Sequence, residues 1–320
     1  MSATPRHRPT LRCATPALLK WLVQAIGVAC FAAASLAQTP NPSVCRELEA
    51  KYDTSRRQLT SVEVNQMLFR ASDLGCEGLA RRLLDDGASL QARDRLGAAP
   101  LSHAAREGRT GLLALYLEKG AAIDARNLMG ATALYFAADT ERPRVVALLL
   151  QKGADPNLAG RSGVTPLAAA AFKGNDRIVE QLLAGGADPK RVDDTGKAAI
   201  TYAAARGFVD VVRRLLDAGV AADTRYGNDL TALMWAAGHD EGVGSRAAVA
   251  VIALLLDRGA PIDAADNRGR TALMMAAELG DAAVVELLLT RGADRTLRDR
   301  QGKTALDLTV SEAVRAKLSN

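Results

Sequence analysis

The sequence is poor in the residues that most enzymes use for chemistry. It has three histidines and four cysteines in 320 residues, and aromatic residues make up 4%. Only His103 and His239 lie beyond residue 38, and the HExxH, GxSxG and CxxC patterns of catalytic and redox sites are absent. Because so few acid–base arrangements are possible, we expect no catalytic residues, no metal ligands and no cofactor.

A surplus of one charge sign is also lacking beyond the first residues. The formal net charge is +5, but four cations precede residue 38 where no Asp or Glu occurs, and about +1 remains without them. These cations are Arg6, Arg8, Arg12 and Lys20. A chain so near neutrality has no global field to steer it onto nucleic acid or an anionic membrane. No aromatic side chains interleave the remaining cations, so we expect no nucleic-acid partner.

The first 37 residues have the layout of a secretory signal peptide. A cationic stretch runs through Lys20, an apolar run extends from Trp21 to Leu36, and small residues precede Gln38. We therefore expect a periplasmic or secreted protein that is cleaved after Ala37 and has no membrane association afterwards. An uncleaved membrane anchor is the alternative, although the apolar run is shorter than the about 20 residues that a span needs.

Cysteine usage fits export. Cys13 and Cys30 would leave with the signal peptide, and the mature chain would keep Cys45 and Cys76. A pair in an oxidising compartment suggests one disulfide. It would close a loop of about 31 residues and contribute about 3 to 4 kcal/mol by the chain-entropy estimate. Two buried thiols are the alternative.

What the chain has in abundance is internal repetition. A Leu or Ile recurs every 33 residues, with one interval of 40. These residues are Leu68, Leu101, Leu134, Leu167, Ile200, Leu233, Leu273 and Leu306. A glycine follows each of the first seven by 19 residues, except that Gly259 is displaced by a seven-residue insertion near 239–245. Chance does not produce such a register, so the chain consists of repeated units.

Each unit has the pattern of two helices. Paired alanines such as Ala104 and Ala105 follow the first Leu, and the second half is amphipathic and ends in paired Leu such as Leu149 and Leu150. The glycine that comes next suits a left-handed C-cap. Between units lies a glycine-containing turn, and a threonine then stands where a helix N-cap hydroxyl is wanted. The threonines are Thr132, Thr165, Thr231, Thr271 and Thr304.

Segments such as VTPLAAAAFKGNDRIVEQLLAGGADPK resemble ankyrin repeats, and the motif recurs in phase over residues 61–320. The resemblance implies an all-α solenoid of eight helix-turn-helix units with projecting hairpin loops, in which each unit contacts only its neighbours. Residues 38–60 would form a linker and an N-terminal capping helix. Glu141 replaces the glycine between two helices and Asp229 replaces a turn glycine, so we expect local irregularities at both.

The two remaining histidines have different settings. His103 occupies an interior helix position that other units fill with Phe136, Tyr202, Trp235 or Met275, so we expect a packed and hydrogen-bonded side chain. His239 lies with Asp240 and Glu241 in the seven-residue insertion, which we expect to be a loop free of packing duties. Adjacent residues rarely converge on one ion, so His239 is a candidate partner contact, with a passive solvated loop as the alternative.

The resemblance places the recognition surface on the hairpin loops and on the outward positions of the first helices, along a concave face. There the second to fourth units carry apolar groups flanked by cations, a combination typical of protein interfaces. The predicted contacts are Arg95, Leu96, Arg106, Leu128, Met129, Arg161, Phe172, Lys173, Arg206, His239, Arg268 and Arg270. Phe172 is the best single anchor because aromatic residues dominate binding hot spots. The alternative for Leu96, Leu128 and Met129 is packing against adjacent loops.

These observations predict a monomeric, non-catalytic protein-binding scaffold in the periplasm, with a partner that the sequence does not identify. An inhibitor or immunity-type protein that blocks a toxin or an enzyme would use the same surface. The resemblance alone adds a third hypothesis, an accessory factor in peroxide defence.

Overall fold

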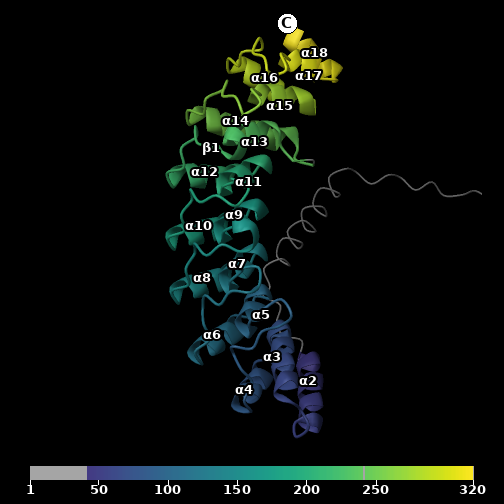
Figure 1. Cartoon of the computed structure of the whole chain (residues 1–320), viewed down its shortest axis with the longest axis vertical. Helices are drawn as coiled ribbons and strands as arrows, with labels where there is room; N and C mark the ends of the chain where they lie inside the picture. The colour runs from purple at the N-terminus through teal and green to yellow at the C-terminus, as the bar shows by residue number, and fades with distance from the viewer. Residues whose placement is uncertain (1–41, 241, 320) are drawn as a thin grey trace, which may run out of the picture. The chain divides into compact units, whose positions relative to one another are not determined.

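The computed structural model describes residues 42–240 and 242–319, which form a capping helix followed by eight helix pairs (Figure 1). The capping helix is α2 (Pro42–Ser55). The first helices of the pairs are α3 (Ser61–Leu74), α5 (Pro100–Arg106), α7 (Ala133–Asp139), α9 (Pro166–Lys173), α11 (Ala199–Ala205), α13 (Ala232–Ala237), α15 (Ala272–Leu279) and α17 (Ala305–Leu308). The second helices are α4 (Glu77–Asp85), α6 (Thr110–Glu118), α8 (Pro143–Gln151), α10 (Asp176–Ala184), α12 (Val209–Asp217), α14 (Ser245–Asp257), α16 (Ala282–Thr290) and α18 (Glu312–Ser319).

Little else in the described residues is regular. Two short 3-10 turns, η1 (Arg161–Gly163) and η2 (Gly227–Asp229), lie in loops, and the two-residue strands β1 (Arg225–Tyr226) and β2 (Leu230–Thr231) pair around η2. None of the described helices is long and apolar enough to cross a membrane. The expected signal peptide, its cleavage site after Ala37, and Cys13 and Cys30 lie outside the described residues.

The helix pairs stack in chain order. Each first helix packs against its own second helix and against the first helices on either side, and the second helices pack on each other in the same way. The apolar residues between the layers, such as Leu167, Ile178 and Leu182, are fully buried and form one continuous row from pair to pair. Buried alanines, such as Ala170 and Ala171, let neighbouring first helices approach closely. The predicted all-α repeat solenoid is therefore confirmed.

The helix ends have the expected chemistry. Each of the five predicted threonines accepts a hydrogen bond from a backbone N–H of the first helical turn, as Thr165 does from Ala168. The turn glycines have positive φ, and at Gly97 a Cβ would collide with Leu128 of the next loop. Glu141 (φ 58°) and Asp229 (φ 62°) adopt the same left-handed backbone without being glycine. Both predicted irregularities are thus real.

The loops between pairs are tied into a row. The carboxylate of Asp193 accepts N–H groups from Thr195 and Lys197 and so shapes its turn, and acids at matching positions act alike in other loops. Backbone hydrogen bonds then join one loop to the next, from Leu128 N–H to the Leu96 carbonyl (3.0 Å), and likewise between later loops. Side chains of successive loops therefore project from one connected backbone surface.

The N-terminal end of the stack is closed by α2. Leu48 and Tyr52 are buried against the first pair, and a disulfide joins Cys45 of α2 to Cys76, just before α4. The Tyr52 hydroxyl donates to Asp86, and Arg82 of α4 forms an ion pair with Asp53. These contacts cover the side of the first pair that faces away from the second pair.

The burial of a side chain between helix pairs predicts how much its replacement by alanine lowers the free energy of unfolding. Leu149 of α8 is fully buried, so Leu149→Ala should lower the free energy of unfolding by about 2 to 5 kcal/mol. Leu128 lies 80% exposed in a loop, and Leu128→Ala should change it by no more than about 0.5 kcal/mol. Urea denaturation followed by circular dichroism measures both, and equal losses in the two variants would contradict the packing described above.

Candidate interaction surface

Aromatic and cationic side chains gather on the first helices of the fourth to sixth pairs. Phe172, at the end of α9, is 39% exposed, and its ring meets the ring of Tyr202 from α11 edge-on, with 5.9 Å between centroids. The guanidinium of Arg206 lies 4.4 Å from the centre of the Phe172 ring. This geometry combines an apolar contact with a cation held over a ring face.

The group extends to the sixth pair through Lys197. Its ammonium lies 5.6 Å from the ring centre of Tyr202 and 4.9 Å from that of Trp235 on α13. We refer to Phe172, Lys197, Tyr202, Arg206 and Trp235 as the aromatic–cation cluster. Because the aromatic rings come from the first helices of three successive pairs, the cluster presents a surface that no single repeat could form.

The cluster is held in place by Asp193. The Tyr202 hydroxyl donates to Asp193, and burial together with this hydrogen bond raises the pKa of Tyr202 above its ordinary value. Burial alone would raise the pKa of Asp193, but hydrogen bonds from Tyr202, from Thr195 and from the Lys197 N–H hold it below its ordinary value. Tyr202 therefore stays protonated and Asp193 ionised at neutral pH, which fixes the ring against the loop.

Most of the predicted contact residues lie on the surface. Phe172 and Lys173 are exposed next to Arg206, which is half-buried in the cluster. Leu96, Leu128 and Met129 are exposed in the loops of the second and third pairs. Arg95, Arg161 and Arg268 are exposed in loops as well. The Leu128 N–H donates a hydrogen bond to the Leu96 carbonyl, yet both leucine side chains are exposed to solvent.

Several predicted contacts are paired within the protein, among them Arg106, Arg270 and His239. Arg106 is half-buried and donates to Asp73 at 3.1 Å, and Arg270 is 12% exposed and forms an ion pair with Glu278. His239 is nearly buried, with Nε2 3.1 Å from the Asp281 carboxylate of the next pair. The expectation that the insertion leaves His239 free of packing is therefore wrong. His239 ties the insertion to the seventh pair, and part of the insertion lengthens α14, which has 13 residues where α12 has 9.

Both His103 and His239 contact carboxylates of neighbouring helices and loops and so help to hold the repeats together. His103 is buried and bridges Asp73 (2.8 Å) and Asp94 (3.1 Å), as predicted for a packed and hydrogen-bonded residue. Near His239, the Ser245 side chain forms a hydrogen bond with Asp281. The Ser245 hydroxyl thus pairs with a carboxylate, whereas an activated serine nucleophile pairs with an imidazole base. No group of three or more His, Cys, Asp or Glu within the described residues is arranged to hold a metal ion.

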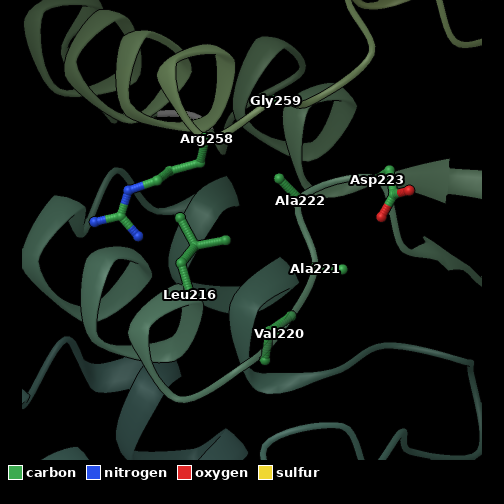
Figure 2. A pocket seen from close by; sticks show the side chains of 7 residues that line it. All are labelled: Leu216, Val220, Ala221, Ala222, Asp223, Arg258 and Gly259. Atoms are coloured by element: carbon green, nitrogen blue, oxygen red, sulfur yellow. The ribbon is translucent and has the colours of Figure 1, made fainter.

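A pocket of about 330 Å³ lies where the end of α12 and the segment after it face Arg258, which follows α14 (Figure 2). Figure 2 shows Arg258 extended past Leu216, with Asp223 on the opposite side of the pocket. Arg258 forms an ion pair with Asp217 at 2.8 Å. Since the two ionisable residues of the lining lie apart, they cannot act together on one ligand group, and we assign this pocket no function.

Part of the cluster escaped prediction. Tyr202 and Trp235 stand at the same helix position as His103 and were interpreted as interior residues only, whereas both are half-buried with Lys197 beside them. The signal that could have found them is an aromatic residue at one position in successive repeats together with a lysine in the adjoining loop.

The His239–Asp281 contact predicts an acid-dependent loss of stability. Burial would raise the pKa of Asp281, but hydrogen bonds from His239, Ser245 and two backbone N–H groups hold it below its ordinary 3.8. Ionised Asp281 therefore stabilises the fold above that pH, and this contribution is lost as the pH falls through the lower pKa of the folded protein. Asp281→Asn should reduce the free energy of unfolding by about 1 to 2 kcal/mol at neutral pH, since Asn still caps a helix but loses the charged bond.

The measurement is urea denaturation from about pH 7 to pH 3, with Asp210→Asn, an exposed acid, as the control. The difference between the wild type and Asp281→Asn should shrink below about pH 4. A difference that stays constant over this range would show that the Asp281 charge does not contribute.

Comparisons with known proteins agree with the observed repeats. A family model described as ankyrin repeats (3 copies) matches residues 37–160 and 167–245, one described as ankyrin repeats (many copies) matches 255–308, and one described as ankyrin repeat matches 228–267. Among solved structures, the human ASB11 ankyrin repeat domain is 28% identical in sequence. The match covers 69% of this chain and 97% of that domain, with a TM-score of 0.62. Among curated proteins, none matches the chain.

Proposed function

The chain belongs to the ankyrin repeat family, and from this premise we propose that it is a scaffold that holds a protein partner on the aromatic–cation cluster. Ankyrin repeats generally mediate protein–protein interaction, and proteins of the family are typically non-catalytic. What the family leaves open is where the partner binds and in which compartment. The exposed Phe172 ring, flanked by Tyr202 and Arg206, is the observation that carries the proposed location.

The cluster has the features of an interface centre. Aromatic and arginine side chains are enriched at protein interfaces and carry a large share of binding energy. Phe172 and Tyr202 hold each other in a fixed geometry, so little side-chain entropy would be lost when a partner covers them. The cations at its edge have long ion pairs, 3.6 Å from Lys173 to Asp139 and 3.7 Å from Arg206 to Asp240. Lys173 can turn toward acidic groups of a partner at little cost, whereas Arg206 can meet them from its place over the Phe172 ring.

The exposed loop residues extend this surface. Leu96, Leu128 and Met129 present apolar side chains at the loops of the second and third pairs, beside the cations Arg95 and Arg161. We assign them a secondary contact that widens the interface, because a stable protein complex buries more area than one cluster supplies. No described feature favours an inhibitor or a peroxide-defence role over this scaffold.

We also propose that the protein is exported. The Cys45–Cys76 disulfide supports this location because disulfides persist in oxidising compartments and are rare in the cytosol. The signal-like composition of residues 1–37 supports it independently.

Replacement of the central ring tests the interface. Cross-linking in cells that produce the protein, followed by mass spectrometry, identifies the partner, and binding is then measured with both proteins purified. Phe172→Asp should weaken binding by at least about tenfold, because a charge then occupies the hot spot. It should not shift the melting temperature by more than a few degrees, since the ring is surface-exposed.

The matched control is Val310→Asp, which introduces the same charge at an apolar residue that is 92% exposed in the eighth pair. It should leave binding unchanged within about twofold. Normal binding by Phe172→Asp, or equal weakening by both variants, would remove the cluster from the interface.

Export and disulfide formation are tested together. Mass spectrometry of the exported protein should find an N-terminus at Gln38, with Cys45 and Cys76 alkylated only after reduction. A chain made without residues 1–37 and retained in the cytosol is the control, and its two thiols should react without reductant. An exported protein that keeps Met1, or whose Cys45 and Cys76 are alkylated without reduction, would contradict the proposal.

A further inference from the structure

A second pocket adjoins the cluster, between the sixth and seventh pairs. It has a volume of about 360 Å³ and is bounded by residues of α13 and α15 and of the loop that joins the two pairs. Trp235, Met275 and Leu279 form an apolar wall, and Leu279 is exposed. Arg268, Arg270 and Glu278 supply the polar groups. An apolar wall with a few charged groups is the usual composition of a site that binds a ligand in one orientation.

The pocket has more hydrogen-bond donors than acceptors. Arg270 donates to Glu278 through Nη2, but its Nε is buried without a partner in the described residues, and so is the indole Nε1 of Trp235. Buried indole N–H groups usually find an acceptor. Arg268 is exposed and its Nε lies 3.3 Å from Asp266. Asp266 is itself buried and already accepts the backbone N–H groups of Arg268 and Arg270.

Glu278 is the one carboxylate of the pocket lining, and its side chain can move away from Arg270. It is 54% exposed, whereas its partner Arg270 is only 12% exposed. Glu278 gains solvation when it swings outward, but the Arg270 guanidinium cannot follow it into water. An outside carboxylate can therefore take the place of Glu278 on Arg270, provided that other contacts hold it there.

We propose that this pocket binds an acidic, leucine-containing linear segment of the protein partner, whose carboxylate replaces Glu278 on Arg270. An aliphatic side chain of the segment packs on Trp235, Met275 and Leu279, and Arg268 meets a second acidic group. The proposal rests on the proposed scaffold function and specifies the chemistry of the partner.

The pocket is continuous with the proposed interface. Trp235 belongs to both, since Lys197 lies over its ring from the side of the cluster. Lys197, Arg268 and Arg270 thus place three cations in or beside the pocket, whose lining contains one acid, Glu278. Such an excess favours an acidic segment and disfavours a basic one.

The test uses defined synthetic peptides and the exported protein that begins at Gln38, so it does not require the natural partner. One fluorescein-labelled peptide alternates glutamate with leucine, a second replaces glutamate with lysine, and a third replaces leucine with serine. Fluorescence anisotropy measures binding, and the emission of Trp235 reports contact with the apolar wall. The only other tryptophan of the sequence, Trp21, is removed by the proposed cleavage after Ala37. Only the glutamate–leucine peptide should bind measurably and change the Trp235 emission.

Two variants test the exchange of carboxylates. Arg270→Gln should weaken binding of the glutamate–leucine peptide by at least about tenfold. Glu278→Gln should strengthen it by about two- to fivefold, because the competing carboxylate is gone. A gain in affinity cannot come from misfolding, so this second variant protects the test against a merely unstable protein.

The controls are Glu286→Gln on α16 and Arg291→Gln at the residue that follows α16. Arg291 pairs with Asp257, and Glu286 pairs with Lys317, so both changes break a comparable ion pair away from the pocket. Neither should alter peptide affinity by more than about twofold.

The proposal is overturned if no peptide binds, if the lysine peptide binds equally well, or if Glu278→Gln leaves the affinity unchanged. These results are distinct from failure of the scaffold proposal, which is judged by Phe172→Asp and the natural partner. The glutamate–leucine peptide could bind as expected while Phe172→Asp leaves binding of the natural partner unchanged. The pocket proposal would then hold, and the centre of the partner interface would lie elsewhere than at Phe172.

Discussion

Each helix pair of this protein can bury its apolar side only against the pairs next to it. A single pair is too small to enclose Leu149 or Ile178, so the stack forms one core by repetition rather than by folding around a centre. This constraint explains the regular features of the chain. It places alanines where first helices approach, leucines between the helix layers, and glycines where the backbone must reverse. Side chains in the loops and at the exposed positions of the first helices take no part in this packing.

The repeat made the fold readable from the sequence. Leucines spaced by 33 residues located each pair, the threonines marked where first helices begin, and Glu141 and Asp229 stood out because they interrupt an otherwise strict pattern. Residues that differ from the repeat were harder. The insertion around His239 has no counterpart in the other units, so periodicity gave no information about its contacts, and only the structure shows its bond to Asp281 and the longer α14.

The candidate surface was predicted only in part, for a related reason. Phe172 could be found because a large aromatic residue at an outward position is unusual. Tyr202 and Trp235 looked like interior residues, and their role became visible only when Lys197 was seen above both rings. Contacts between neighbouring repeats depend on side-chain directions, which residue spacing does not specify. The same holds for the pocket beside Trp235, whose polar groups come from a loop and a helix.

The two ends of the stack are secured differently. At the N-terminal end, α2 is joined covalently to the first pair through Cys45 and Cys76, and Tyr52 and Arg82 add polar contacts. At the C-terminal end, α17 has only four residues, and Val310 beside it is almost fully solvated. A linear array loses structure most easily from its weaker end. Fraying should therefore proceed with a polarity, from the eighth pair inward, so that the pocket between the sixth and seventh pairs opens before the Phe172 and Tyr202 rings of the fourth and fifth pairs come apart.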